Sequence, residues 1–109
     1  MNKLLSLIVP VFNEEEVLPA SYARMSAAMQ ALTGYDYEII YVNDGSRDGT
    51  MKQLRAIAGE HKEVRVISFS RNFGHQLAVT AGMDNARGDA LIIIDADLQD
   101  PPELIPQML

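Results

Sequence analysis

Three carboxylates and one amide follow directly on an unbroken apolar run, and they are the residues of this chain best suited to chemistry. The run covers residues 91–94 and leads into Asp95, Asp97, Gln99 and Asp100. Side chains of an extended chain alternate between faces, so Asp95, Asp97 and Gln99 are expected to point the same way. Two like charges held that close require a cation.

Hard divalent ions such as Mg²⁺ and Mn²⁺ take oxygen ligands, and Mg²⁺ is often held by one or two carboxylates together with phosphate oxygens of the substrate. The Asp95-Ala96-Asp97 spacing therefore predicts a site for a metal and a diphosphate. Asp-x-Asp also occurs often by chance, and the alternative is that Asp95 caps a strand end while the other acids are solvated. The position directly after a strand buried on both faces favours the metal site.

Length and composition limit the possible classes of protein. The chain has 109 residues, which is enough for one domain, and its net charge of -6 argues against a nucleic-acid partner. Cysteine is absent, which excludes disulfides and thiolate metal sites. Acids at 14–16 directly follow the first apolar run, where a signal peptide would have its cleavage region, so we interpret that run as a strand. No stretch approaches the roughly 20 apolar residues of a membrane span.

Strands and helices are expected to alternate along the chain. The pattern predicts strands at 4–11, 37–42, 64–69 and 91–94. The first helix is expected to begin near Glu16, with Pro19 in its first turn and the other apolar positions on one face. The inward residues of the three helices are Leu18, Tyr22, Met25, Met29, Leu32, then Leu54, Ile57, Ala58, then Leu77, Ala78, Ala81.

This alternation predicts right-handed βαβ units, and therefore an α/β, Rossmann-like parallel sheet with helices on both faces. With strand order 3-2-1-4, the crevice opens between strands one and four at the carboxyl edge of the sheet. The loop with Asn13 and Glu14 then meets Asp95 and Asp97, and Asp44 lies next to them. The dinucleotide fingerprint G-x-G-x-x-G is missing from the first turn, which removes the usual NAD interpretation.

Two further loops carry polar residues. In residues 43–50, Asp44 and Ser46 can bond a ligand or cap the next helix, and on its own a turn with an N-cap is the better interpretation. Arg71 is interpreted as the only cation at these strand tips, where a phosphate, a base or an ion pair are all open to it. His75 is taken as solvated or structural, since no second histidine or cysteine lies at ligand spacing.

Taken together, these segments resemble the family 2 glycosyltransferases of GT-A fold. The resemblance rests on VPVFNEE at 9–15, VNDGS at 42–46, RNFG at 71–74, AG at 81–82, GD at 88–89 and DAD at 95–97. The extension DADLQDPPE at 95–103 looks most like the branch of dolichol-phosphate mannose synthase and bacterial undecaprenyl-phosphate sugar transferases. Asn43 departs from the acid that many relatives carry there, but this position varies to Asn in this branch.

The resemblance implies roles for particular residues. Nucleotide-sugar binding is expected at Pro10, Phe12, Asn13, Glu14, Val42, Asp44, Gly45, Ser46, Arg71 and Ala96. Asp95 and Asp97 are expected to be catalytic, and with Gln99 they match the positions around the Mg²⁺ or Mn²⁺ ion.

The implied reaction is inverting transfer of a sugar from a nucleotide-sugar donor, for which we expect UDP, to a polyprenyl phosphate at the cytoplasmic face of a membrane. A phosphate acceptor is already ionised and needs no strong general base. Relatives continue past this point, so residues 1–109 are interpreted as the truncated amino-terminal nucleotide-sugar-binding part. Alone, this part is expected to be soluble, inactive in transfer and prone to self-association, with membrane association through parts absent from this chain.

Two alternatives remain. The first is a nucleotide-binding module without turnover. The second is a haloacid-dehalogenase-like phosphatase, which also places D-x-D after a buried strand but in an early position. It is the less favoured, because the motif here follows the fourth strand and Gln99 stands where Thr or Val is expected.

Overall fold

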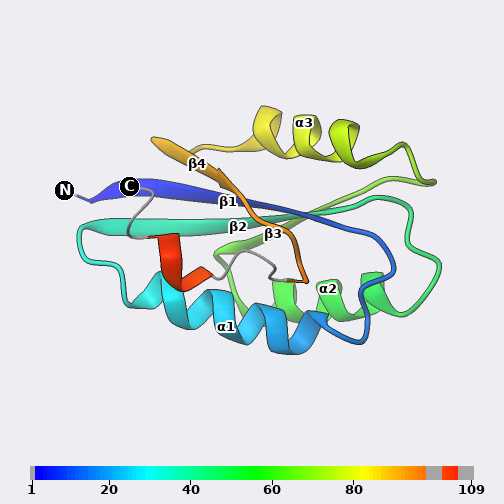
Figure 1. Ribbon diagram of the computed structural model, residues 1–109, viewed down its shortest axis with the longest axis horizontal. Coiled ribbons are helices and arrows are strands. Elements are labelled where there is room, and N and C mark those ends of the chain that lie inside the picture. Colours follow the sequence, from blue (N-terminus) through cyan, green and yellow to red (C-terminus); the bar gives the residue numbers. More distant parts are fainter. Residues whose placement is uncertain (1, 98–101, 106–109) are drawn as a thin grey trace.

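The computed structural model describes residues 2–97 and 102–105, and its elements alternate as the sequence predicts (Figure 1). In chain order they are β1 (Lys3–Val11), α1 (Leu18–Gln30), β2 (Tyr35–Asn43), α2 (Thr50–Glu60), β3 (Val64–Ser68), α3 (His75–Asn85), β4 (Ala90–Ile93) and the 3₁₀ helix η1 (Pro102–Leu104). Helix α1 begins two residues later than expected, because residues 15–17 form a turn before it.

A four-stranded parallel sheet forms the centre of the molecule, in the order β3-β2-β1-β4. The predicted α/β fold and the 3-2-1-4 order are confirmed. Strands β1 and β2 pair along their full lengths, from Lys3 with Tyr35 to Val11 with Asn43. Strand β4 pairs with β1 only from Ala90 to Ile93, so the chain that enters the Asp-x-Asp segment comes from a short edge strand.

The two faces of the sheet are covered unequally. Helices α1 and α2 lie on one face and α3 alone lies on the other (Figure 1). The larger core, on the α1 and α2 side, contains Leu5, Leu7, Val9, Leu18, Met25, Ile39, Tyr41 and Leu54, all of which are fully buried. The smaller core on the α3 side is built on Ile40, Val42 and Ala78.

Two expectations about the α3 side are wrong. Strand β4 is not buried on both faces, because Leu91 and Ile93 are each 46% exposed. Leu77 of α3, expected to point inward, is 52% exposed. Helix α3 packs closely on the sheet further along, where a Cβ added at Gly82 would overlap Ile8 of β1. One helix covers the inner strands and leaves this face of the edge strand open.

A buried acid ties the strands together at the amino edge of the sheet. The Glu38 carboxylate is 6% exposed and accepts hydrogen bonds from Ser6 Oγ at 2.6 Å, Arg87 N–H at 2.8 Å and the Arg65 guanidinium at 3.1 Å. Burial alone raises the pKa of Glu38, but these three hydrogen bonds outweigh it, and the pKa lies below its ordinary value. The network joins β1, β2 and β3 to the connection between α3 and β4.

Candidate functional site

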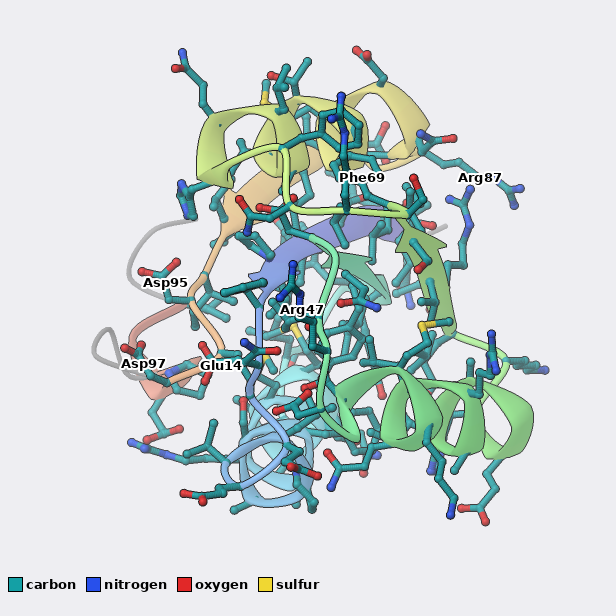
Figure 2. All side chains as sticks on the ribbon, turned by 90° about the vertical axis from the view of Figure 1, so that its right-hand side faces the viewer. Glu14, Arg47, Phe69, Arg87, Asp95 and Asp97 are labelled. Atoms are coloured by element: carbon teal, nitrogen blue, oxygen red, sulfur yellow. The ribbon has the colours of Figure 1, made fainter. Side chains whose placement is uncertain are left out.

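A pocket of about 370 Å³ opens at the carboxyl edge of the sheet, where β1, β2 and β4 end. Its lining is Pro10, Val11, Phe12, Glu14, Asp44, Asn72, Gly74, His75, Asp95, Ala96 and Asp97. Figure 2 shows Glu14 and Asp97 close together at the rim, with Asp95 above them. The juxtaposition of the first loop with the Asp-x-Asp segment, predicted from the strand order, is therefore present.

The segment after β4 keeps its alternation although the strand has ended. Ile94 and Ala96 are buried, at 3% and 2% exposed, while Asp95 and Asp97 are exposed and line the same pocket. The buried residues fix the backbone against the core and leave both carboxylates in the pocket. His75 Nε2 lies 3.4 Å from Asp95 Oδ1, so this histidine belongs to the pocket and not to bulk solvent alone.

Glu14 adds a third acid to this pocket. Its pKa lies above the ordinary value because of partial burial first, and then because of the negative charges of Asp97, Asp48 and Asp95. The carboxylates at this edge therefore repel one another. Such an arrangement suits a ligand that brings positive charge with it.

The oxygen donors of this pocket are of the kind that a hard divalent ion takes. Among residues 2–97 and 102–105, no group of three or more His, Cys, Asp or Glu side chains is close enough to hold a metal by itself. Asp95 and Asp97 do share the pocket, and two carboxylates completed by diphosphate oxygens are a usual Mg²⁺ environment. The oxygens present therefore fit a divalent ion that is bound together with a diphosphate. Gln99, the third predicted ligand, lies outside the described residues.

Asp44 organises the loop that follows β3. This side chain is 4% exposed, and its two oxygens accept hydrogen bonds from the backbone N–H groups of Phe73 at 2.7 Å and Gly74 at 3.1 Å. Next to it, Gly45 has φ of 75°, and a Cβ there would overlap the backbone of Arg71. Only glycine fits this close approach without strain. Asp44 and Gly45 therefore hold the β2 and β3 loops against each other.

A second hollow, of about 320 Å³, is also lined by Phe12. Arg47 and Arg71 both line it, so Arg71 is not the only cation at these strand tips as the sequence had suggested. The Arg71 guanidinium stacks on the ring of Phe73, 4.6 Å from its centroid. Phe12 is 43% exposed and lines both hollows, which places an aromatic face between an acidic pocket and a basic one.

Most of the remaining predicted residues line one of the two hollows. Pro10 and Ala96 line the first pocket, whereas Asn13, Gly45, Ser46 and Arg71 line the second hollow. Val42 lines neither, because it is fully buried under α3. Their parts in nucleotide binding stay predictions.

Two residues that sequence reasoning did not single out also reach this edge. Asp48 and Thr50 bond the backbone of the β1 loop, at Glu15 N–H and Glu14 N–H. They lie in segment 43–50, for which the sequence predicts only a turn with an N-cap at Asp44 or Ser46, because hydrogen bonds across 33 and 36 residues leave no local signal.

Comparison with known proteins decides the family. The profile of Glycosyl transferase family 2 matches residues 6–109. The chain belongs to this family. The family assignment agrees with the GT-A resemblance and leaves the phosphatase alternative without support.

Curated relatives in this family are considerably longer than the chain. The uncharacterized glycosyltransferase YkcC of Bacillus subtilis is 52% identical over 104 residues, which is 95% of this chain and 32% of YkcC. The bactoprenol glucosyl transferase of Shigella phage SfV is 49% identical over 105 residues, which is 96% of this chain and 34% of the phage protein. The chain thus spans about a third of the length of the curated relatives it matches.

Solved structures confirm the fold. The mannosyltransferase PcManGT from Pyrobaculum calidifontis, in complex with GDP-Man and Mn²⁺, superimposes with a TM-score of 0.76 over 89% of this chain and 28% of that protein. The two sequences are 22% identical, so the likeness bears on the GT-A fold alone.

None of the helices in residues 2–97 and 102–105 has the length and apolar character of a membrane span.

Proposed function

We propose that the protein carrying this chain transfers a sugar from a nucleotide-sugar donor to a polyprenyl phosphate, and that residues 1–109 are its donor-binding part. The observation that carries the proposal is the pocket at the carboxyl edge. It brings Glu14, Asp95 and Asp97 together beside the exposed ring of Phe12. Clustered acids next to an aromatic face suit a metal-bound diphosphate attached to a planar base.

In this proposal, different residues bind different parts of the nucleotide-sugar donor. Phe12 offers its ring to the base, and Arg71 lies across the second hollow with hydrogen-bond donors for the base or ribose. Asp95 and Asp97 would hold Mg²⁺ or Mn²⁺. Such an ion neutralises the negative charge that develops on a departing nucleoside diphosphate. We propose a UDP-linked sugar as the donor, and a panel of nucleotides tests the base directly.

The acceptor part of the proposal rests on the relatives. The similar phage protein is called a bactoprenol glucosyl transferase, and an undecaprenyl-phosphate sugar transferase of Aeromonas hydrophila is 44% identical over 108 residues. An ionised phosphate oxygen attacks without a strong general base, and attack opposite the leaving group inverts the anomeric carbon. The chain supplies no Ser-His or Cys-His pair within the described residues. We place the reaction at the cytoplasmic side of a membrane.

Metal-dependent nucleotide binding tests the donor site. Calorimetry with UDP and GDP, in MnCl₂ and in EDTA, is expected to show binding only with the metal. Asp97→Asn removes one charged ligand and is expected to weaken binding by about one to two decades, the value of a bond to a charged group. Asp36→Asn, which removes the same charge from an exposed position at the amino end of β2, is the matched control. Equal affinity in EDTA and in Mn²⁺ contradicts the proposal.

Transfer is tested with the protein expressed at its full encoded length. Radiolabelled nucleotide sugars are incubated with short polyprenyl phosphates, and the lipid is then extracted. Label in the lipid is the expected result. Binding of nucleotide with no label from any donor would instead identify a binding module without turnover. Residues 1–109 alone are expected to give no label, because positioning both reactants contributes about 7–11 kcal/mol that a donor site cannot supply alone.

A further inference from the structure

Three consecutive backbone N–H groups of the β1–α1 loop each donate to a side chain of the β2–α2 loop or of the first residue of α2. The donor and acceptor residues are Asn13 with Ser46 at 2.9 Å, Glu14 with Thr50 at 2.9 Å and Glu15 with Asp48 at 3.3 Å. Asn13 has φ of 53°, a left-handed conformation that is uncommon outside glycine and that asparagine adopts more readily than most residues. The three hydrogen bonds tie the path of this loop to the neighbouring segment.

Thr50 is the central member of this set, because its hydroxyl donates one hydrogen bond and accepts another. Its side chain is fully buried, and its hydroxyl donates to Asp48 Oδ1 at 2.5 Å. Since a hydroxyl has a single proton, the oxygen is left to accept from Glu14 N–H. The Thr50 side-chain bond is the first cause of the lowered pKa of Asp48, so this acid stays ionised and keeps the hydroxyl oriented.

The ionised Glu14 carboxylate is destabilised by its surroundings. The negative charges of Asp97, Asp48 and Asp95 all raise the pKa of Glu14, after the effect of burial. Electrostatic attraction therefore does not keep the Glu14 carboxylate in the pocket. The backbone of this residue, in contrast, is held by the bond from its N–H to Thr50.

We propose that the Thr50 hydroxyl, oriented by Asp48, is a positioning group that fixes the backbone of Glu14 and so holds its carboxylate in the metal and diphosphate pocket. The inference rests on the proposed function, because it takes the pocket to bind a nucleoside diphosphate with a divalent ion. Neither Asp48 nor Thr50 lines this pocket. They act through Glu14.

The test compares two substitutions that differ by one hydroxyl. Thr50→Val keeps the volume and removes the hydroxyl, whereas Thr50→Ser keeps the hydroxyl. UDP and GDP are titrated with MnCl₂ into the protein at its full encoded length. Thr50→Val is expected to weaken binding about tenfold, the effect of losing one well-placed hydrogen bond, and Thr50→Ser to stay within about twofold of the parent.

A double-mutant cycle separates positioning from general loss of structure. If Thr50 acts through the Glu14 carboxylate, Thr50→Val costs about tenfold in the parent but less than about twofold when Glu14→Gln is already present. A merely structural role gives the same loss in both backgrounds. Ser6→Ala is the matched control, since it removes a buried hydroxyl at the opposite edge. It is expected to lower the unfolding midpoint without changing the affinity.

Each outcome bears on a different statement. If the parent binds neither UDP nor GDP with Mn²⁺, the proposed function falls and this inference falls with it. If the parent binds but Thr50→Val has no effect, or the same effect in both backgrounds, the inference alone is overturned. An unchanged affinity in Glu14→Gln overturns it too, because Glu14 is then no part of the site.

Discussion

Glu38 and Glu14 are carboxylates at opposite edges of one sheet, and the fold surrounds them differently. Glu38, at the amino edge, accepts bonds from Ser6, Arg65 and Arg87 N–H, and its pKa is lowered. The pKa of Glu14, at the carboxyl edge, is raised by partial burial first and then by the negative charges of Asp97, Asp48 and Asp95. The buried acid at the amino edge thus has hydrogen-bond partners that stabilise its ionised form. The acids at the carboxyl edge instead repel one another, and the divalent ion of the proposed function would relieve that repulsion.

The largest expected effect comes from breaking the amino-edge network. Glu38→Ala leaves the Ser6 hydroxyl and the Arg87 N–H without their acceptor and leaves Arg65 without its carboxylate. We expect a loss of about 3 kcal/mol in the free energy of unfolding, as for a broken buried pair. Urea denaturation measures it, with exposed Asp36→Ala as control. A loss below about 1 kcal/mol would show that the network is not worth more than a surface pair.

The pH dependence of stability separates the two acids by sign. The lowered pKa of Glu38 means that its contribution is present above its ordinary value of 4.5 and is lost as the pH falls through the lowered value. The raised pKa of Glu14 gives the opposite: its contribution is full below 4.5 and is lost as the pH rises through the raised value.

Urea midpoints from about pH 3 to about pH 7 measure both slopes. Glu38→Gln is expected to flatten the acid limb of the curve, and Glu14→Gln the limb above it. Parallel curves for the two variants would contradict the comparison.

The Tyr41 hydroxyl is a buried polar group that belongs neither to the amino-edge network nor to the pocket. The Tyr41 hydroxyl is fully buried and has no hydrogen-bond partner among the described residues, and burial raises its pKa. Tyr41→Phe removes only this oxygen. We expect a gain of about 1 kcal/mol in stability, because an unsatisfied buried hydroxyl is costly. Nucleotide affinity serves as the control and is expected to stay unchanged. A destabilised variant would mean that the hydroxyl is satisfied after all.

The smallest expected effect is also the most specific to the site. Glu14→Gln removes one repelling charge and is expected to raise stability by about 0.5 kcal/mol in EDTA, the size of a partly exposed charge pair. With MnCl₂ and UDP the parent is expected to be the more stable of the two proteins, because it binds more tightly and binding stabilises the folded state. Thermal unfolding under both conditions measures the reversal. The same order in both would remove Glu14 from the proposed site.

The sequence predicts the frame of this site because the frame depends on periodic and local signals. Apolar runs that end in Asn13, Asp44 and Asp95 locate three strand tips, and parallel strands bring their carboxyl ends to one edge. Four buried positions of α1, at Leu18, Tyr22, Met25 and Met29, follow from their spacing.

What the sequence could not predict depends on distant partners. The bonds from the Asn13 loop to Ser46 and Thr50 cross more than thirty residues, and no local pattern records them. An apolar run such as 91–94 does not say how many of its faces are covered, which is why the exposure of Leu91 and Ile93 was missed. Arg47 was overlooked because a charge inside a glycine-rich turn looks the same whether it faces solvent or a hollow.

The short pairing of β4 with β1 determines which part of the site is expected to unfold first. Backbone bonds secure β1 to β2 over nine residue pairs but β4 to β1 over only four, at the rim of the sheet. Amide protons of β4 are therefore expected to exchange with solvent well before those of β1 and β2, through local opening that leaves the rest folded. We therefore expect Asp95 and Asp97 to leave the pocket in such an opening while Phe12, Glu14 and Asp44, on the loops after β1 and β2, stay in place.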